Sequence, residues 1–126
     1  MTEPRVPARP AIDCDPDAGV PAPPLTLHVS RAATLDVVLQ GEIDFGNAPA
    51  ILEETSAAIR RRRPAVVRVD LAGITYFDST AVRMLVRIAS VAEEVAATIR
   101  MENASPAVRR VLEVTGLWQH FGLSEP

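Results

Sequence analysis

The sequence places two hydroxyl side chains directly after a carboxylate, in Asp78-Ser79-Thr80, where an apolar run gives way to a segment with helical periodicity. The N-terminus of a helix presents unpaired N–H groups and a partial positive charge of about half an elementary charge. A hydroxyl group held there can carry a phosphate, and it can equally serve as an ordinary N-cap. The residue types alone leave both roles open for Ser79.

Other chemistries find little support in the sequence. No Gly-rich phosphate-binding loop follows a predicted strand. The single cysteine, Cys14, lies in a Pro-rich stretch, which argues against cysteine catalysis. Ser79 lacks the flanking glycines of a nucleophile elbow, and neither His28 nor His120 has companions at the spacing of metal ligands. We therefore predict a binding domain rather than an enzyme, without a metal or a cofactor.

The composition is typical of one globular domain. The 126 residues suffice for a single core, and 48% of them are apolar. The formal net charge of −3 argues against direct binding to nucleic acid. No apolar run reaches the roughly 20 residues that a membrane span needs, and the N-terminus has no continuous apolar signal segment. We therefore predict a cytoplasmic protein that does not enter a membrane.

The N-terminal residues 1–24 differ in composition from the rest of the chain. They hold seven of the eleven prolines, together with Asp13, Asp15 and Asp17. Proline fixes φ and removes an N–H donor, and this stretch has little apolar surface to bury. We predict a disordered Pro-rich tail over 1–24 and one folded domain over 25–123.

The elements that must position Ser79 follow from hydrophobic periodicity, which alternates in strands and repeats at i, i+3 and i+4 in helices. In chain order we expect strands at 25–30 and 35–40 that form a hairpin, a helix from Asn47 to Arg63, a strand at 65–71, a helix after Thr80, a strand at 97–102 and a helix at 105–115. Two strand–helix–strand crossovers, which are parallel and right-handed in nearly all proteins, predict an α/β domain. Its sheet should be mixed, with four or five strands and helices mainly on one face.

Four local features refine this scheme. Gly73 should break the central strand, so that a short loop delivers Ser79 to its helix. Asn47 should cap the first helix and Gly116 should close the last one in a left-handed conformation. The arginines at 60–63 suit the negative end of a helix, and we favour that role over a nucleic-acid or acidic-lipid patch because the run is short and the net charge is negative.

The chain resembles the STAS domain of bacterial anti-sigma factor antagonists over roughly residues 25–123. Three segments carry the resemblance, and all three occur in the family's order. They are Gly41-Glu42-Ile43-Asp44, the segment from Val69 to Thr80 that ends in Asp78-Ser79-Thr80, and the segment from Ser105 to Leu117. The resemblance implies a four- or five-stranded sheet with helices on one side, in agreement with the periodicity.

In antagonists of this family the serine directly after the aspartate is phosphorylated, which here is Ser79. The resemblance implies that the unphosphorylated protein binds an anti-sigma factor, which carries a histidine-kinase-like ATPase domain and acts as a serine kinase, and thereby releases a sigma factor. Phosphorylation ends binding, and a PP2C-type phosphatase reverses it. The protein itself would be a monomer or a weak dimer. The expected partner-binding residues are Asp44, Asp78, Ser79, Thr80, Ala81 and Arg83.

Ala81 departs from the family pattern, because a glycine usually stands at this position. We expect its Cβ to lie beside the hydroxyl group on the docking surface. This departure keeps a second function open, in which the chain is a STAS scaffold subunit that is not phosphorylated, for example in a lipid-transport ATPase complex. A regulatory switch and a scaffold are the two main alternatives at this point, and an enzyme with Ser79 as its nucleophile is the third.

Overall fold

Four strands form a mixed sheet in the order β1-β2-β3-β4. The computed structural model describes residues 23–30 and 33–121, so nearly all of the predicted tail, residues 1–22, lies outside the described part. The elements are β1 (Leu25–Ser30), β2 (Thr34–Ile43), α1 (Ala48–Arg62), β3 (Val66–Phe77), α2 (Ser79–Glu94), β4 (Thr98–Glu102) and α3 (Pro106–Val114). The predicted order of strands and helices is confirmed, and the α/β class with it.

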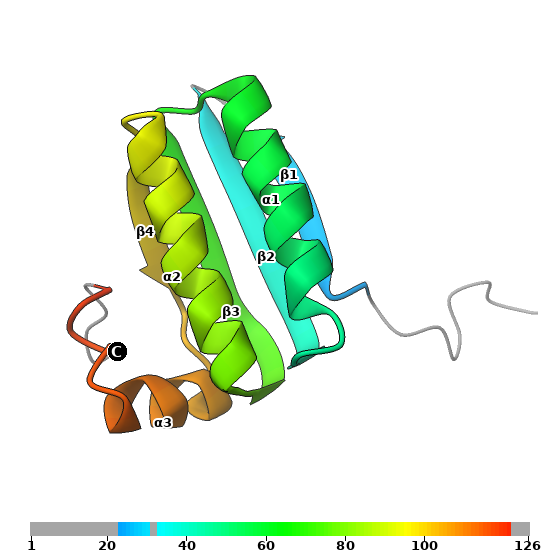
Figure 1. Ribbon diagram of the computed structural model, residues 1–126, viewed down its shortest axis with the longest axis vertical. Helices are drawn as coiled ribbons and strands as arrows, with labels where there is room; N and C mark the ends of the chain where they lie inside the picture. The colour runs from blue at the N-terminus through cyan, green and yellow to red at the C-terminus, as the bar shows by residue number, and fades with distance from the viewer. Residues whose placement is uncertain (1–22, 31–32, 122–126) are drawn as a thin grey trace, which may run out of the picture.

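The strand directions agree with the expected hairpin and crossovers. β1 pairs antiparallel with β2, with Leu25 opposite Leu39. β2 pairs parallel with β3, and β3 pairs parallel with β4. Helices α1 and α2 lie side by side over one face of the sheet, and α3 packs near the end of β3 (Figure 1). The carboxyl ends of β2 and β3 therefore meet at one end of the sheet, where Ser79 begins α2.

The hydrophobic core lies between the sheet and the two covering helices. Val67, Val69 and Leu71 of β3 are fully buried, and Leu85 and Ile88 of α2 are fully buried as well. Burying one such side chain contributes roughly 1.5–3 kcal/mol relative to leaving it exposed. This packing anchors both elements that meet at Ser79.

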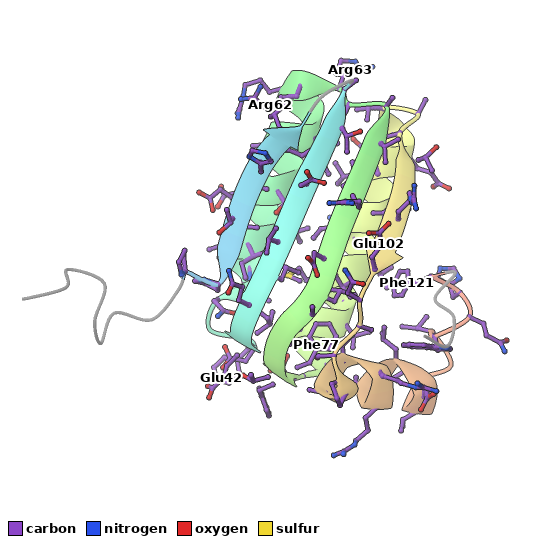
Figure 2. All side chains as sticks on the ribbon, turned by 180° about the vertical axis from the view of Figure 1, so that it is seen from behind. Glu42, Arg62, Arg63, Phe77, Glu102 and Phe121 are labelled. Carbon is purple, nitrogen blue, oxygen red and sulfur yellow. The ribbon has the colours of Figure 1, made fainter. Side chains whose placement is uncertain are left out.

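The opposite face of the sheet carries charged side chains (Figure 2). Arg68 of β3 donates to Asp36 of β2 at 2.9 Å and lies 3.7 Å from Glu102 of β4. Arg100 lies 3.1 Å from the same Glu102. These four residues form a chain of ion pairs across three strands.

Gly73 does not break the central strand, so the prediction of a loop between Gly73 and Ser79 is wrong. β3 continues to Phe77, and its pairing with β2 shifts register between Val38 and Gln40 and again between Gly41 and Glu42. A Cβ on Gly73 would lie 3.3 Å from the Cβ of Gln40. The glycine therefore allows two strands to approach closely at a bulged pairing, which is a common reason for glycine within a strand.

The helix ends largely follow the sequence signals. α1 ends at Arg62, and Arg63 adopts a left-handed φ of 46° while its N–H donates to the carbonyl of Ile59 at 2.8 Å. Ser105 caps α3 by accepting from Val108 N at 3.4 Å. Gly116 has a φ of 78° just after α3, as its position predicted.

Candidate functional site

Ser79 is the first residue of α2, and Asp78, not Ser79, is the N-cap. Asp78 has an extended backbone, and its Oδ1 accepts a hydrogen bond from Ala81 N at 2.9 Å. The side chain of Ser79 is exposed and has no hydrogen-bond partner among the described residues. Of the two roles that the sequence left open, the cap role therefore belongs to the neighbouring carboxylate. The hydroxyl group of Ser79 is left available at the positive end of the helix.

The second oxygen of Asp78 ties α2 to the connection between β2 and α1. Its Oδ2 accepts a hydrogen bond from Phe45 N at 3.1 Å, and Asp78 N donates to the carbonyl of Ile43 at 3.4 Å. Because β2 and β3 are parallel neighbours, their carboxyl ends bring these two segments together. One carboxylate thus holds both segments in a fixed relative position.

The connection itself is held by its own polar side chains. Asp44 Oδ1 accepts from Gly46 N at 2.9 Å. Asn47 Oδ1 accepts from Asp44 N at 3.0 Å, and Asn47 Nδ2 donates to the carbonyl of Glu42 at 2.8 Å. Asn47 occupies the N-cap position of α1, as expected, but its side chain makes no capping hydrogen bond. Its amide instead fixes the turn that presents Asp44 and Phe45.

Phe45 is 77% exposed at the tip of this turn, and the sequence reasoning did not single it out. Tyr76, near the end of β3 and opposite Glu42 in the pairing, is 52% exposed. An aromatic side chain between Asp44 and Gly46, in a segment that must turn, is the signal that could have identified Phe45. Exposed aromatic side chains on a rigid backbone are typical anchors of protein–protein contacts.

Five of the six expected partner-binding residues expose side-chain surface at this end of the sheet. Ser79 and Arg83 are exposed, one helical turn apart on α2, whereas Asp44, Asp78 and Thr80 are partly buried. We call Asp44, Phe45, Asp78, Ser79, Thr80 and Arg83 the Ser79 surface.

Ala81 is the exception among the expected residues. Its side chain is 0% exposed and belongs to the core cluster, so the placement of its Cβ on the docking surface is wrong. In the first turn of α2, one side points to the core and the other to solvent, and Ala81 falls on the core side. Its methyl group fills the interior without covering the Ser79 hydroxyl.

The residues around Ser79 combine polar, charged and aromatic groups. Among residues 23–30 and 33–121, no group of three His, Cys, Asp or Glu side chains could hold a metal ion. Within the same ranges, no helix has the length and apolar character required to cross a membrane. The site offers an exposed hydroxyl group, the positive end of α2, the carboxylates of Asp44 and Asp78, and an exposed aromatic ring.

The comparison with protein families identifies one match. A family model described as "Mlab, STAS domain" matches residues 28–123. A STAS-domain containing protein of Pseudomonas aeruginosa is 35% identical over 91 residues, which cover 71% of this chain and 87% of that protein. The residues matched by the family model include every element that contributes to the Ser79 surface.

Solved structures share the fold. The anti-sigma factor antagonist SpoIIAA in its unphosphorylated form superposes with a TM-score of 0.66 at 26% identity, over 74% of this chain and 81% of that chain. An anti-sigma factor antagonist from Mycobacterium paratuberculosis gives a TM-score of 0.67 at 22% identity, over 81% and 85% of the two chains. At 22% identity, the similarity to the Mycobacterium paratuberculosis protein shows the fold alone.

Proposed function

Because the chain belongs to the STAS domain family, we propose that it is an anti-sigma factor antagonist that phosphorylation of Ser79 switches off. The unphosphorylated protein would bind an anti-sigma factor with a histidine-kinase-like ATPase domain, and binding would release a sigma factor. The same partner would phosphorylate Ser79, and a PP2C-type phosphatase would restore the hydroxyl group. The structural similarity to the antagonist SpoIIAA supports this general role.

One observation carries the proposal: the hydroxyl group of Ser79 is exposed and is not used as a cap. Asp78 already satisfies Ala81 N, so modification of Ser79 removes no hydrogen bond that holds α2. A phosphate at this position would face the positive end of the helix, which the fold tolerates. Phosphorylation can therefore change the surface without unfolding the domain.

The physical basis of the switch is local electrostatics. A phosphate adds a charge of about −1.5 to −2 at neutral pH, next to the carboxylate of Asp78. A partner surface that is complementary to a neutral hydroxyl then meets repulsion and an unfavourable desolvation term, together several kcal/mol. Since about 1.4 kcal/mol corresponds to a tenfold change in affinity, such a penalty suffices to end binding.

The direct test uses the full chain with its cognate kinase and ATP, followed by mapping of the phosphate by mass spectrometry. We expect phosphate on Ser79, no phosphate in Ser79→Ala, and phosphate still on Ser79 in Thr80→Ala, which is the matched control for the position of the phosphate. Binding of Ser79→Glu to the kinase should be at least about 100-fold weaker than that of the wild type. Phosphate on Thr80 instead, or full affinity of Ser79→Glu, would contradict the proposal.

The family comparison favours a second candidate function as well. The matching model carries the name of Mlab and not that of an anti-sigma factor antagonist. In this alternative, the chain is an unphosphorylated STAS subunit of a membrane transport complex, such as a lipid-transport ATPase, and the Ser79 surface contacts that ATPase. Co-purification of the tagged chain with an ATPase and a permease, without phosphate on Ser79, would decide for it. Co-purification with a serine kinase would decide against it.

A further inference from the structure

A second charged surface lies at the end of the sheet opposite Ser79. Arg61 and Arg62 end α1 there and Arg63 follows as its C-cap. All three are exposed, and none of them forms an ion pair with a residue that the structure describes. Their neighbour Arg60 contrasts with them, because its guanidinium lies 3.2 Å from Glu94 of α2. Arg60 of α1 thus pairs with Glu94 of α2, whereas the next three arginines present about three positive charges to solvent.

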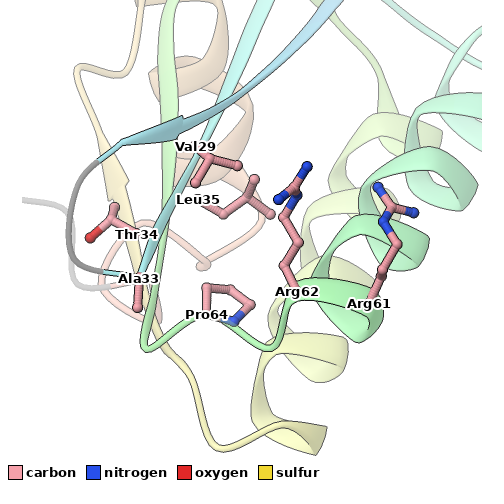
Figure 3. A pocket seen from close by; sticks show the side chains of 7 residues that line it. All are labelled: Val29, Ala33, Thr34, Leu35, Arg61, Arg62 and Pro64. Atoms are coloured by element: carbon pink, nitrogen blue, oxygen red, sulfur yellow. The ribbon is translucent and has the colours of Figure 1, made fainter.

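Arg61 and Arg62 line a pocket of about 330 Å³, and Arg63 follows them directly in the chain. Figure 3 shows the side chains of Arg61 and Arg62 on one side of it, with Val29 and Leu35 of the β1–β2 hairpin and Pro64 nearby. The remaining lining residues are Ala33 and Thr34. The pocket combines apolar walls with two guanidinium groups, so the ligand it suits is a negatively charged segment that also carries small apolar side chains.

The negative end of α1 does not cancel this charge. A helix C-terminus contributes about half a negative elementary charge, and that contribution falls off within the last turn. Three guanidinium groups outweigh it and extend beyond it into solvent. The favourable interaction with the helix end explains why arginine is tolerated here, but it does not neutralise most of the positive charge.

We propose that the chain's own acidic segment, Asp13–Asp17, docks in this pocket and pairs with Arg61, Arg62 and Arg63. The segment has the matching chemistry, since it carries three carboxylates at alternate positions with small residues between them. No other stretch of the sequence before β1 carries more than one acidic residue. The proposal is independent of the role assigned to Ser79.

The length of the intervening chain allows this contact. Asp17 lies eight positions before Leu25, and a Pro-rich chain advances about 3.1 Å per residue, so the connection spans up to about 25 Å. Val29, which lines the pocket, lies four positions after Leu25 along β1, or about 13 Å at a strand rise of about 3.3 Å. β1 is an edge strand, so the path along its outer side is not occupied by another strand of the sheet.

Covalent attachment makes a weak contact effective. A short flexible connection holds the segment at an effective concentration on the order of millimolar. Exposed ion pairs are individually weak and are screened by salt. We therefore expect the docked form to dominate at low ionic strength and to be lost at high ionic strength.

Cys14 is the only cysteine and lies inside the acidic segment, so a nitroxide label can be attached there in the full chain without other changes. In ¹⁵N spectra at low salt we expect strong paramagnetic broadening at the amides of Val29, Thr34 and Leu35. The amide of Arg83, at the other end of the sheet, should show little. In about 1 M salt, where the Debye length is about 3 Å, the broadening at all three amides should fall to that of Arg83.

Matched variants identify the charges involved. Replacing the three arginines by glutamine keeps good helix formers and should abolish the selective broadening. Replacing Asp13, Asp15 and Asp17 by asparagine in the labelled chain should do the same, whereas Arg83→Gln should leave it unchanged. Broadening that is uniform, that centres on the Ser79 surface, or that persists in both charge-neutral variants would overturn the proposal.

Discussion

The carboxylate of Asp78 and the backbone N–H of Phe45 are joined by a hydrogen bond of 3.1 Å between two segments that are far apart in the sequence. The same carboxylate caps α2 through Ala81 N at 2.9 Å. One side chain therefore holds both the backbone of an exposed aromatic residue and the start of the helix that carries Ser79.

Asp78→Ala should lower the free energy of unfolding by about 2 kcal/mol. Loss of an N-cap costs roughly 0.5–2 kcal/mol, and the lost hydrogen bond to Phe45 N adds roughly 0.5–1.5 kcal/mol. Ser79→Ala, one residue away, should change stability by no more than about 0.5 kcal/mol because Ser79 is exposed and caps nothing. Urea denaturation of both variants measures the difference. Equal losses in the two variants would show that Asp78 is not the cap.

Phe45→Ala should weaken binding of the partner by about 30-fold or more, if Phe45 is an anchor worth about 2 kcal/mol. Its side chain is 77% exposed, so the stability of the free domain should stay nearly unchanged. Titration calorimetry with the isolated partner measures the affinity. Val29→Ala, an exposed apolar position at the other end of the sheet, is the control and should bind as the wild type does. Wild-type affinity in Phe45→Ala would place the contact elsewhere.

Gly41→Ala should destabilise the domain by about 1–2 kcal/mol, the cost of a left-handed conformation for a residue with a Cβ. Gly41 has a φ of 80°, and a Cβ there would meet nothing within 4 Å, so the cost arises from the backbone alone. Gly41→Asn should cost less because asparagine tolerates this region better than alanine does. Thermal unfolding of both variants gives the comparison, and an alanine variant as stable as the asparagine variant would refute the backbone explanation.

The ion pair between Arg60 and Glu94 should make a pH-dependent contribution to stability. The hydrogen bond from Arg60 lowers the pKa of Glu94 below its ordinary value. A carboxyl group whose pKa is lowered by folding adds stability above its unfolded pKa, and that stability is lost as the pH falls through the folded value. The stability difference between the wild type and Glu94→Gln should therefore be fully present above about pH 5 and should shrink as the pH falls through the ordinary Glu pKa of about 4.3 and below it.

Both groups of this pair are exposed, so the effect should be small and should weaken in salt. Urea midpoints at several pH values, with and without added salt, measure it. Glu93→Gln is a suitable control, because this neighbouring exposed carboxylate has no ion pair with the described residues. A difference between wild type and Glu94→Gln that does not depend on pH would rule out the electrostatic origin.

Features with a local cause could be predicted from the sequence. The hairpin, the order of the elements and the inner faces of α2 and α3 follow from periodicity, which each segment carries by itself. Gly116 was expected in a left-handed conformation, and it has a positive φ of 78°. The capping of α3 by Ser105 is equally local.

Features that depend on a distant partner could not be predicted in the same way. The continuation of β3 through Gly73 depends on a bulged pairing with Gln40, which no local pattern reveals. Because the strand runs on to Phe77, Asp78 takes the cap position and Ala81 turns into the core. The wrongly predicted strand end thus accompanies two features that the sequence did not predict, the cap at Asp78 and the burial of Ala81.

The exposure of Phe45 was missed for a related reason. Its position depends on how Asn47 folds back onto Asp44 and Glu42 and on the hydrogen bond to Asp78. Each of these side chains has another common role, as a helix cap or as a solvated charge. The sequence marks Phe45 as an aromatic residue in a turn, and the arrangement of these side chains in space shows how the turn is held.

The chain of ion pairs on the uncovered face of the sheet determines how this domain can meet other proteins. Asp36, Arg68, Glu102 and Arg100 lie in succession across three strands. A second layer placed on this face would have to strip water from all four charges without offering better partners. We therefore expect the uncovered face to resist stacking against another protein, in agreement with the two contact surfaces proposed at the ends of the sheet, around Ser79 and around Arg61 to Arg63.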